Sequence, residues 1–143
     1  MAGAMVAVLA LVNTVVWLVG PHPDAASHPV TDEADPLVRS LLAFLGADAD
    51  RSSIRGYEEY RGFEPWFFVE NQGFHCLMLV HRASQSVDGA NCVPPGVDLF
   101  ADIGEWRDLG SDYIDGVPLG SIVRFHYRGN SVDVFVYPTS EAD

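Results

Sequence analysis

The chain contains no lysine, and its eight basic side chains are all arginines. Catalysis through a lysine Schiff base or a lysine general base is therefore excluded. The sequence also lacks the GxSxG, HExxH, P-loop and GxGxxG patterns that carry common hydrolytic, zinc-dependent and nucleotide-dependent chemistry. We therefore assign no catalytic residue, no metal ligand and no cofactor, and we expect a protein that is not an enzyme.

Positive charge is scarce beside negative charge. Twenty acidic residues stand against eight arginines, which gives a net charge of −12 at pH 7. An acidic surface repels nucleic-acid phosphates and anionic lipid headgroups. We therefore expect no nucleic-acid partner and interpret the acidity as a feature that keeps the domain soluble.

Charge is also missing from residues 1–20, where Asn13 and Thr14 are the only polar residues. A run of about 20 apolar residues is long enough to cross a hydrocarbon core of about 30 Å as a helix. A cleaved secretory signal has a basic start, an apolar core of about 7–15 residues and a small-x-small cleavage site. Here no basic residue precedes the core, the core is longer, and Pro21-His22-Pro23-Asp24 is a poor context for cleavage. The segment therefore predicts a transmembrane signal-anchor in the lipid bilayer, single-pass, with the C-terminal domain extracytoplasmic.

Residues 21–35 contain three prolines, four acidic residues and one larger apolar side chain, Val30. Such a composition buries too little apolar surface to offset the entropy lost on ordering. It predicts a flexible acidic linker in which His22 and His28 are solvated rather than metal-bound.

Residues 36–143 have the length of one domain, and they open with the signature of a short helix. Asp35 suits the N-cap, Pro36 the first helical position, and Gly46 the left-handed stop. The apolar face expected at helical spacing consists of Leu37, Leu41, Leu42, Phe44 and Leu45.

Two apolar runs, residues 66–69 and 74–80, flank Asn71-Gln72-Gly73, which predicts a β-hairpin. Both faces of the second run are largely apolar, so we expect a central strand. A third strand is predicted over 87–93, ended by Pro94-Pro95-Gly96. For residues 97–106, alternation favours a strand over a helix.

The end of the chain predicts a second hairpin around the two-residue loop Gly129-Asn130. This register pairs Tyr127 with Val132, Phe125 with Val134 and Val123 with Val136. One face is then wholly apolar, and a shift of one residue would mix the two faces.

Cys76 and Cys92 are the only cysteines, and they follow an export-type segment. An even pair in that context favours a disulfide, which would stabilise by about 3 kcal/mol in the chain-entropy model. Two free buried thiols are the alternative. His75 adjoins Cys76, but neighbours on a strand point to opposite faces, so no Cys–His nucleophile is expected.

The polar face of the terminal hairpin carries Arg124, His126 and Arg128, a local departure from the acidic background. This row is a possible surface site for an anionic group or an acidic partner. The alternative, which we favour, is cross-strand pairing with Asp133 and neighbouring acids. Asp98, Asp102 and Glu105 would form a stripe if that segment were helical, but solvation is the simpler interpretation.

The chain resembles short membrane-anchored proteins of unknown function from actinobacteria. The likeness is carried by the apolar span, by Cys76-Leu77-Met78-Leu79-Val80, by Asn91-Cys92-Val93-Pro94-Pro95-Gly96 and by Gly120-Ser121-Ile122-Val123-Arg124-Phe125. It implies an exported domain with a paired-cysteine β core and supplies no activity. The chain departs from that layout in having no basic residue before the span.

Together these features predict an α+β protein with an N-terminal transmembrane helix, a linker, and a small, mostly antiparallel β-sheet domain with one short helix. The leading hypothesis for its function is a non-enzymatic binding or interaction module with an envelope protein partner. A cell-envelope hydrolase using acidic residues would need two carboxylates with raised pKa values in one pocket. An accessory subunit of a membrane complex would need a large exposed apolar patch.

Overall fold

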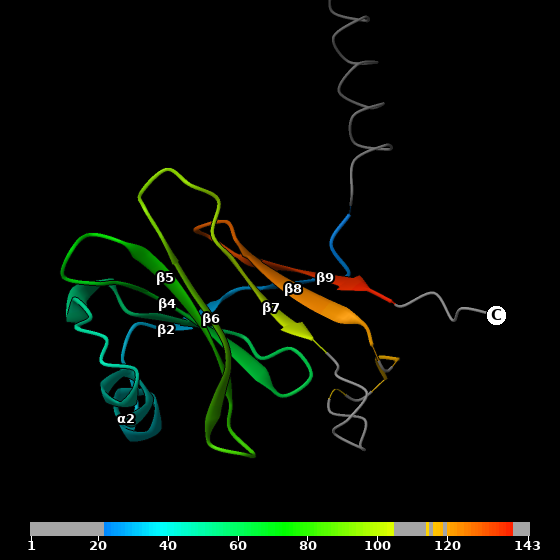
Figure 1. Ribbon diagram of the computed structural model, residues 1–143, viewed down its shortest axis with the longest axis horizontal. Coiled ribbons are helices and arrows are strands. Elements are labelled where there is room, and N and C mark those ends of the chain that lie inside the picture. Colours follow the sequence, from blue (N-terminus) through cyan, green and yellow to red (C-terminus); the bar gives the residue numbers. More distant parts are fainter. Residues whose placement is uncertain (1–21, 105–113, 115, 119, 139–143) are drawn as a thin grey trace, which may run out of the picture.

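The computed structural model describes residues 22–104, 114, 116–118 and 120–138, which form two antiparallel sheets and one α-helix (Figure 1). The five-stranded sheet has the order β2-β3-β4-β5-β6, and the four-stranded sheet has the order β1-β9-β8-β7. The elements are β1 (Ala25–Ser27), β2 (Pro29–Thr31), α2 (Pro36–Phe44), the 3-10 turn η1 (Arg51–Ser53), β3 (Arg55–Tyr57), β4 (Phe63–Val69), β5 (His75–His81), β6 (Ser86–Val93), β7 (Phe100–Gly104), β8 (Ile122–Tyr127) and β9 (Val132–Tyr137).

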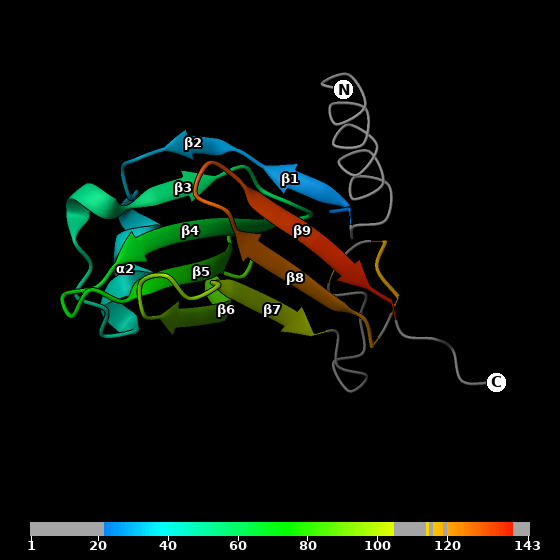
Figure 2. The ribbon, with the colours of Figure 1, turned by 90° about the horizontal axis from the view of Figure 1, so that it is seen from above.

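The two sheets pack face to face, and α2 covers the other face of the five-stranded sheet (Figures 1 and 2). Between the sheets, Phe63 and Phe67 of β4 meet Phe125 of β8 and Val134 of β9. At the edge of this core the Tyr57 hydroxyl donates to the Gly129 carbonyl at 2.7 Å. The molecule thus has three layers: a helix, a five-stranded sheet and a four-stranded sheet.

The expected central strand is confirmed, because β5 lies between β4 and β6. Its side chains alternate between two cores. Leu77 and Leu79 face the four-stranded sheet, while Met78 and Val80 lie under α2. A strand covered on both faces needs apolar residues at successive positions, which is the pattern of this segment.

The helix α2 begins and ends where its sequence predicts. The Asp35 carboxylate accepts from the Val38 amide at 3.1 Å, and Gly46 has φ +66°. The expected apolar face is corrected in part: Leu41 and Leu42 are buried, but Phe44 is 85% exposed and Leu45 is 43% exposed. At about 100° per residue, Phe44 lies about 120° around the helix from the buried Val38, and Leu45 falls after the last helical residue.

The expectation of a flexible linker is wrong for residues 25–31. Within that segment β1 pairs with β9 and β2 pairs with β3, so it supplies an edge strand to each sheet. The Asp24 side chain also accepts from the Val136 amide at 2.7 Å. The physical reason is that an edge strand is held by main-chain hydrogen bonds and tolerates proline, so its apolar content is a poor guide.

Both expected hairpins form. β4 and β5 join through Asn71-Gln72-Gly73, with Val69 opposite His75 and Gly73 at φ +86°. β8 and β9 join through Gly129-Asn130, where the Arg128 amide donates to the Ser131 carbonyl at 2.8 Å. Gly129 has φ +88°, which suits the first loop position of a type II′ turn. The observed pairs Tyr127–Val132, Phe125–Val134 and Val123–Val136 confirm the expected register.

The two strands predicted in the middle of the chain, over residues 87–93 and within residues 97–106, are also confirmed in outline. β6 covers the third expected strand, and β7 lies within the segment for which a strand was favoured. Gly89 of β6 lies close to the backbone of Asp102 of β7. A Cβ at position 89 would be only 2.9 Å from the Asp102 carbonyl oxygen, so this close approach requires glycine. The Asn91 amide donates to the Phe100 carbonyl at 2.9 Å, which fastens β6 to β7.

The proposed transmembrane segment, residues 1–20, lies outside the described residues, as does Glu105. Among the residues that are described, no helix has the length and apolar character needed to cross a bilayer.

Candidate binding surfaces

The expected disulfide is present. Cys76 on β5 and Cys92 on β6 lie directly opposite each other in the ladder and are bonded. Cys76 is buried beneath α2, whereas Cys92 is exposed. The bond therefore ties the last strand of the five-stranded sheet to its central strand.

The row Arg124, His126 and Arg128 lies on the outer face of the four-stranded sheet, which we define by Phe100, Ile122, Arg124, His126, Phe135 and Tyr137. Each basic side chain has an acidic neighbour. Arg124 pairs with Asp102, Arg128 with Asp133 at 3.3 Å, and His126 lies 3.9 Å from Asp98. These contacts are those of the cross-strand alternative, and they offset much of the positive charge of the row.

Arg124 lies at the centre of the outer face and is held from several sides. Its Nε and Nη2 donate to the two carboxylate oxygens of Asp102 at 2.8 and 2.9 Å. Its guanidinium also stacks over the Phe100 ring at 4.1 Å and lies 5.8 Å from the Tyr137 ring. The bidentate pair raises the pKa of the Arg124 guanidinium. Arg124 is therefore a fixed, planar, charged group framed by aromatic rings.

His126 lies beside Arg124 in a depression of about 280 Å³ that Asp98, Phe100 and Tyr137 also line. Burial lowers the pKa of the His126 imidazole, and the neighbouring charge of Arg128 lowers it further. The imidazole is therefore neutral at pH 7, so the row carries two charges rather than three.

The other histidines occupy separate places. His75 packs edge-on against Phe67 at one end of β5, and His81 stacks on Phe63 at the other end. His28 is exposed and lies 3.6 Å from Glu58. Within the described part of the chain, no group of three or more His, Cys, Asp or Glu residues is placed to hold a metal ion.

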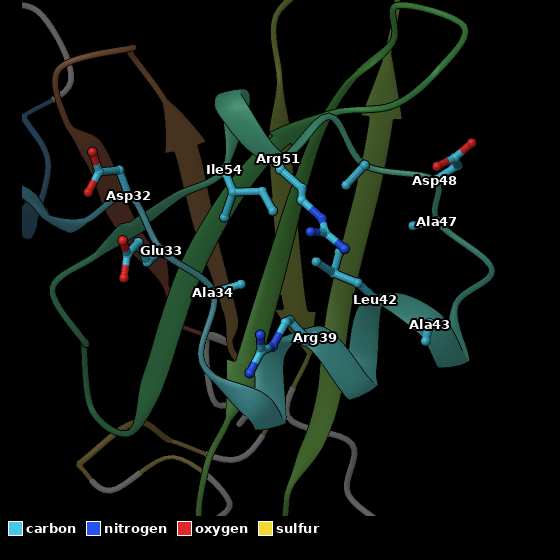
Figure 3. Close-up of a pocket in the computed structure, with 11 residues that line it drawn as sticks. Asp32, Glu33, Ala34, Arg39, Leu42, Ala43, Ala47, Asp48, Arg51 and Ile54 are labelled. Atoms are coloured by element: carbon cyan, nitrogen blue, oxygen red, sulfur yellow. The ribbon is translucent and has the colours of Figure 1, made fainter.

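A larger hollow lies between α2 and η1 and has a volume of about 460 Å³ (Figure 3). We call it the arginine groove. Arg39 projects from α2 and Arg51 reaches from η1 toward α2, while Asp32 and Glu33 lie on one side and Asp48 on the other. Leu42, Ile54 and the alanines 34, 43, 47 and 49 supply its apolar lining.

Beside this groove Arg82 joins α2 to β4 by pairing with both Asp35 and Glu64. The hydrogen bond from Arg82 holds the pKa of the Asp35 carboxyl below its ordinary value, and that of the Val38 amide adds to the effect. Asp35 is thus committed to a structural ion pair and to the helix cap. It is ionised at neutral pH and cannot act there as a general acid.

The sequence indicated the basic row on β8. It indicated neither the aromatic rings around Arg124, which are those of Phe100, Phe135 and Tyr137, nor the arginine groove. The frame follows from the hairpin register, since Phe135 lies opposite Arg124 and Tyr137 opposite Ile122. The groove depends on how α2 packs beside η1, for which no local pattern gives a signal. No protein family, curated protein or solved structure matches the chain.

Proposed function

We propose that the chain is a single-pass membrane protein whose extracytoplasmic domain is a non-enzymatic binding module for an envelope protein partner. Two features support the location. Residues 1–20 have the length and composition of a membrane anchor. The Cys76–Cys92 disulfide is typical of proteins that fold in oxidising compartments.

The observation that carries the binding role is the outer face of the four-stranded sheet. The corresponding face of the five-stranded sheet is covered by α2, but among the described residues no element covers the outer face. It presents Tyr137, 50% exposed, and Ile122, 44% exposed, beside the stacked Arg124. Tyrosine and arginine are the residues that most often dominate protein interfaces.

The arrangement of Arg124 favours binding over catalysis. A side chain already fixed by Asp102 and Phe100 loses little conformational freedom when a partner docks on it. The Asp102 carboxylate is occupied by that pair, and the pKa of Asp35 is lowered rather than raised. A hydrolase working through paired carboxylates would need the opposite shift.

Site-specific photocrosslinking in cells tests this proposal. A photoreactive residue at Tyr137 in the full chain should give a discrete protein adduct, and Arg124→Ala should reduce its yield. The matched control is Val30, which is 61% exposed on β2 of the other sheet and should give no such adduct. Equal labelling from both positions, or no adduct at Tyr137, would contradict a binding face on the four-stranded sheet.

A further inference from the structure

We infer that the arginine groove binds a small zwitterion, a free amino acid or short peptide that carries a carboxylate and an ammonium group. The carboxylate would lie against Arg39 and Arg51, and the ammonium would lie toward Asp32 and Glu33. This site is separate from the outer face of the four-stranded sheet and goes beyond the proposed partner binding.

The first support is the state of the two arginines. Neither Arg39 nor Arg51 forms an ion pair or side-chain hydrogen bond within the described part of the chain. This holds although the domain is strongly acidic, with a net charge of −12. Two guanidinium groups facing one hollow offer planar donor pairs of the kind that bind a carboxylate bidentately.

Two acids near Arg51, Asp48 and Asp50, do not neutralise it because their carboxylates are bonded elsewhere. The Asp48 carboxylate accepts from the Asn71 amide at 3.0 Å, and Figure 3 shows it pointing away from Arg51. The Asp50 carboxylate accepts from the backbone and hydroxyl of Ser52, where it caps η1. The donors of Arg39 and Arg51 are therefore left for a ligand.

The acidic side of the groove narrows the class of ligand. Asp32 and Glu33 form no ion pair within the described residues and lie on the side of the groove away from Asp48 (Figure 3). Their charge repels a polyanion such as a nucleic acid and attracts an ammonium group. A molecule with one charge of each sign matches both sides.

The apolar lining of the groove favours a ligand with a small apolar part between its carboxylate and its ammonium group. Leu42 and Ile54 are buried, and the other apolar residues of the lining are the alanines 34, 43, 47 and 49. The volume of about 460 Å³ is in the range of small-molecule pockets. An alanine peptide has the methyl groups, the carboxylate and the ammonium that these walls would accept.

Isothermal titration calorimetry of the purified full chain with trialanine tests the inference. We expect saturable binding that Arg39→Ala and Arg51→Ala each weaken about tenfold or more, since each removes a charged hydrogen-bond donor. Arg55→Ala is the matched control, because it removes an exposed arginine that does not line the groove, and it should change the affinity less than about twofold. Both groove arginines are exposed, so unchanged thermal unfolding should show that these variants fold.

Modified probes separate the two ends of the ligand. Trialanine amide, which lacks the carboxylate, and N-acetyl trialanine, which lacks the ammonium, should both bind more weakly than trialanine. Inorganic phosphate should compete poorly. The inference is wrong if trialanine does not bind, if its affinity survives both arginine substitutions, or if phosphate binds as tightly as the peptide. None of these results bears on Tyr137 crosslinking, so the two proposals fail separately.

Discussion

Phe125 and Arg124 are neighbours on β8 that serve opposite faces of the same strand. Phe125 is fully buried between the two sheets, where the Tyr60 ring meets it edge-on at 6.2 Å. Arg124 lies on the outer face against Asp102 and Phe100. The alternation of a strand thus separates a residue of the core from a residue of the proposed binding surface.

This separation predicts unequal losses of stability. Phe125→Ala removes a buried aromatic ring and should lower the free energy of unfolding by about 3–5 kcal/mol. Arg124→Ala breaks a partly exposed ion pair and should cost about 1 kcal/mol or less. Urea unfolding of the two variants beside the unchanged chain measures both. Equal losses would mean that the faces of β8 have been assigned wrongly.

Residue-level prediction from sequence succeeded where two constraints met. The terminal hairpin combined a two-residue loop containing glycine with strict alternation, and only one register made a wholly apolar face. The apolar face of α2 was less determined, because nine helical residues offer several overlapping apolar stripes. Packing against β4 and β5 selected the stripe that contains Val38 and left Phe44 exposed.

At the scale of elements, Arg82 connects the start of α2 to β4 through Asp35 and Glu64. In the folded chain the pKa of the Asp35 carboxyl lies below its ordinary value of 3.8. Between these two pKa values the unfolded chain therefore binds more protons at this residue than the folded chain does. The contribution of this carboxylate to the free energy of unfolding is therefore fully present above pH 3.8. It is lost as the pH falls through the pKa that Asp35 has in the folded chain.

Asp35→Asn isolates this charge, because asparagine also serves as an N-cap. The variant should be less stable than the unchanged chain by about 1 kcal/mol or less at neutral pH, since the ion pair is partly exposed. The difference should disappear well below pH 3.8. Urea unfolding at both pH values checks this, with Asp32→Asn as a control that leaves Arg82 untouched. A difference that persists in acid would argue against the ion pair as its cause.

The disulfide cross-links the two strands of the hairpin formed by β5 and β6. Cys76 and Cys92 are 16 residues apart, so their bond should stabilise by about 3 kcal/mol in the chain-entropy model. Replacing both by alanine should lower the free energy of unfolding by about that amount, and a reducing agent should destabilise the unchanged chain but not the variant. Rapid alkylation of both thiols in the native, unreduced protein would contradict the bond.

Element-level prediction failed at the N-terminal edge strands for an identifiable reason. Apart from Val30, the side chains of residues 25–31 are small, polar or proline, but β1 and β2 are held through their backbones by β9 and β3. By contrast, β5 was recognised because burial on both faces left a continuous apolar run. Sequence patterns report side-chain burial, and they are silent where the main chain alone completes a sheet.

At the scale of the whole molecule, the arginine groove and the outer face lie on different layers. The groove is beside α2, which covers one face of the five-stranded sheet, and the outer face belongs to the four-stranded sheet beyond the other (Figure 2). The described chain begins at residue 22 and leads into β1, which lies away from α2 (Figure 2). Neither the groove nor this separation follows from a local sequence pattern, because both arise from the packing of the layers.

We propose above all that residues 1–20 anchor a domain that works outside the cytoplasm. It is tested most directly by fusing two reporters in turn after Asp143 of the full chain, one active only outside the cytoplasm and one active only within it. We expect the first reporter to be active in the membrane fraction and the second to be inactive. Deletion of residues 1–20 should abolish the association of the chain with the membrane. Activity from the cytoplasmic reporter alone would contradict it.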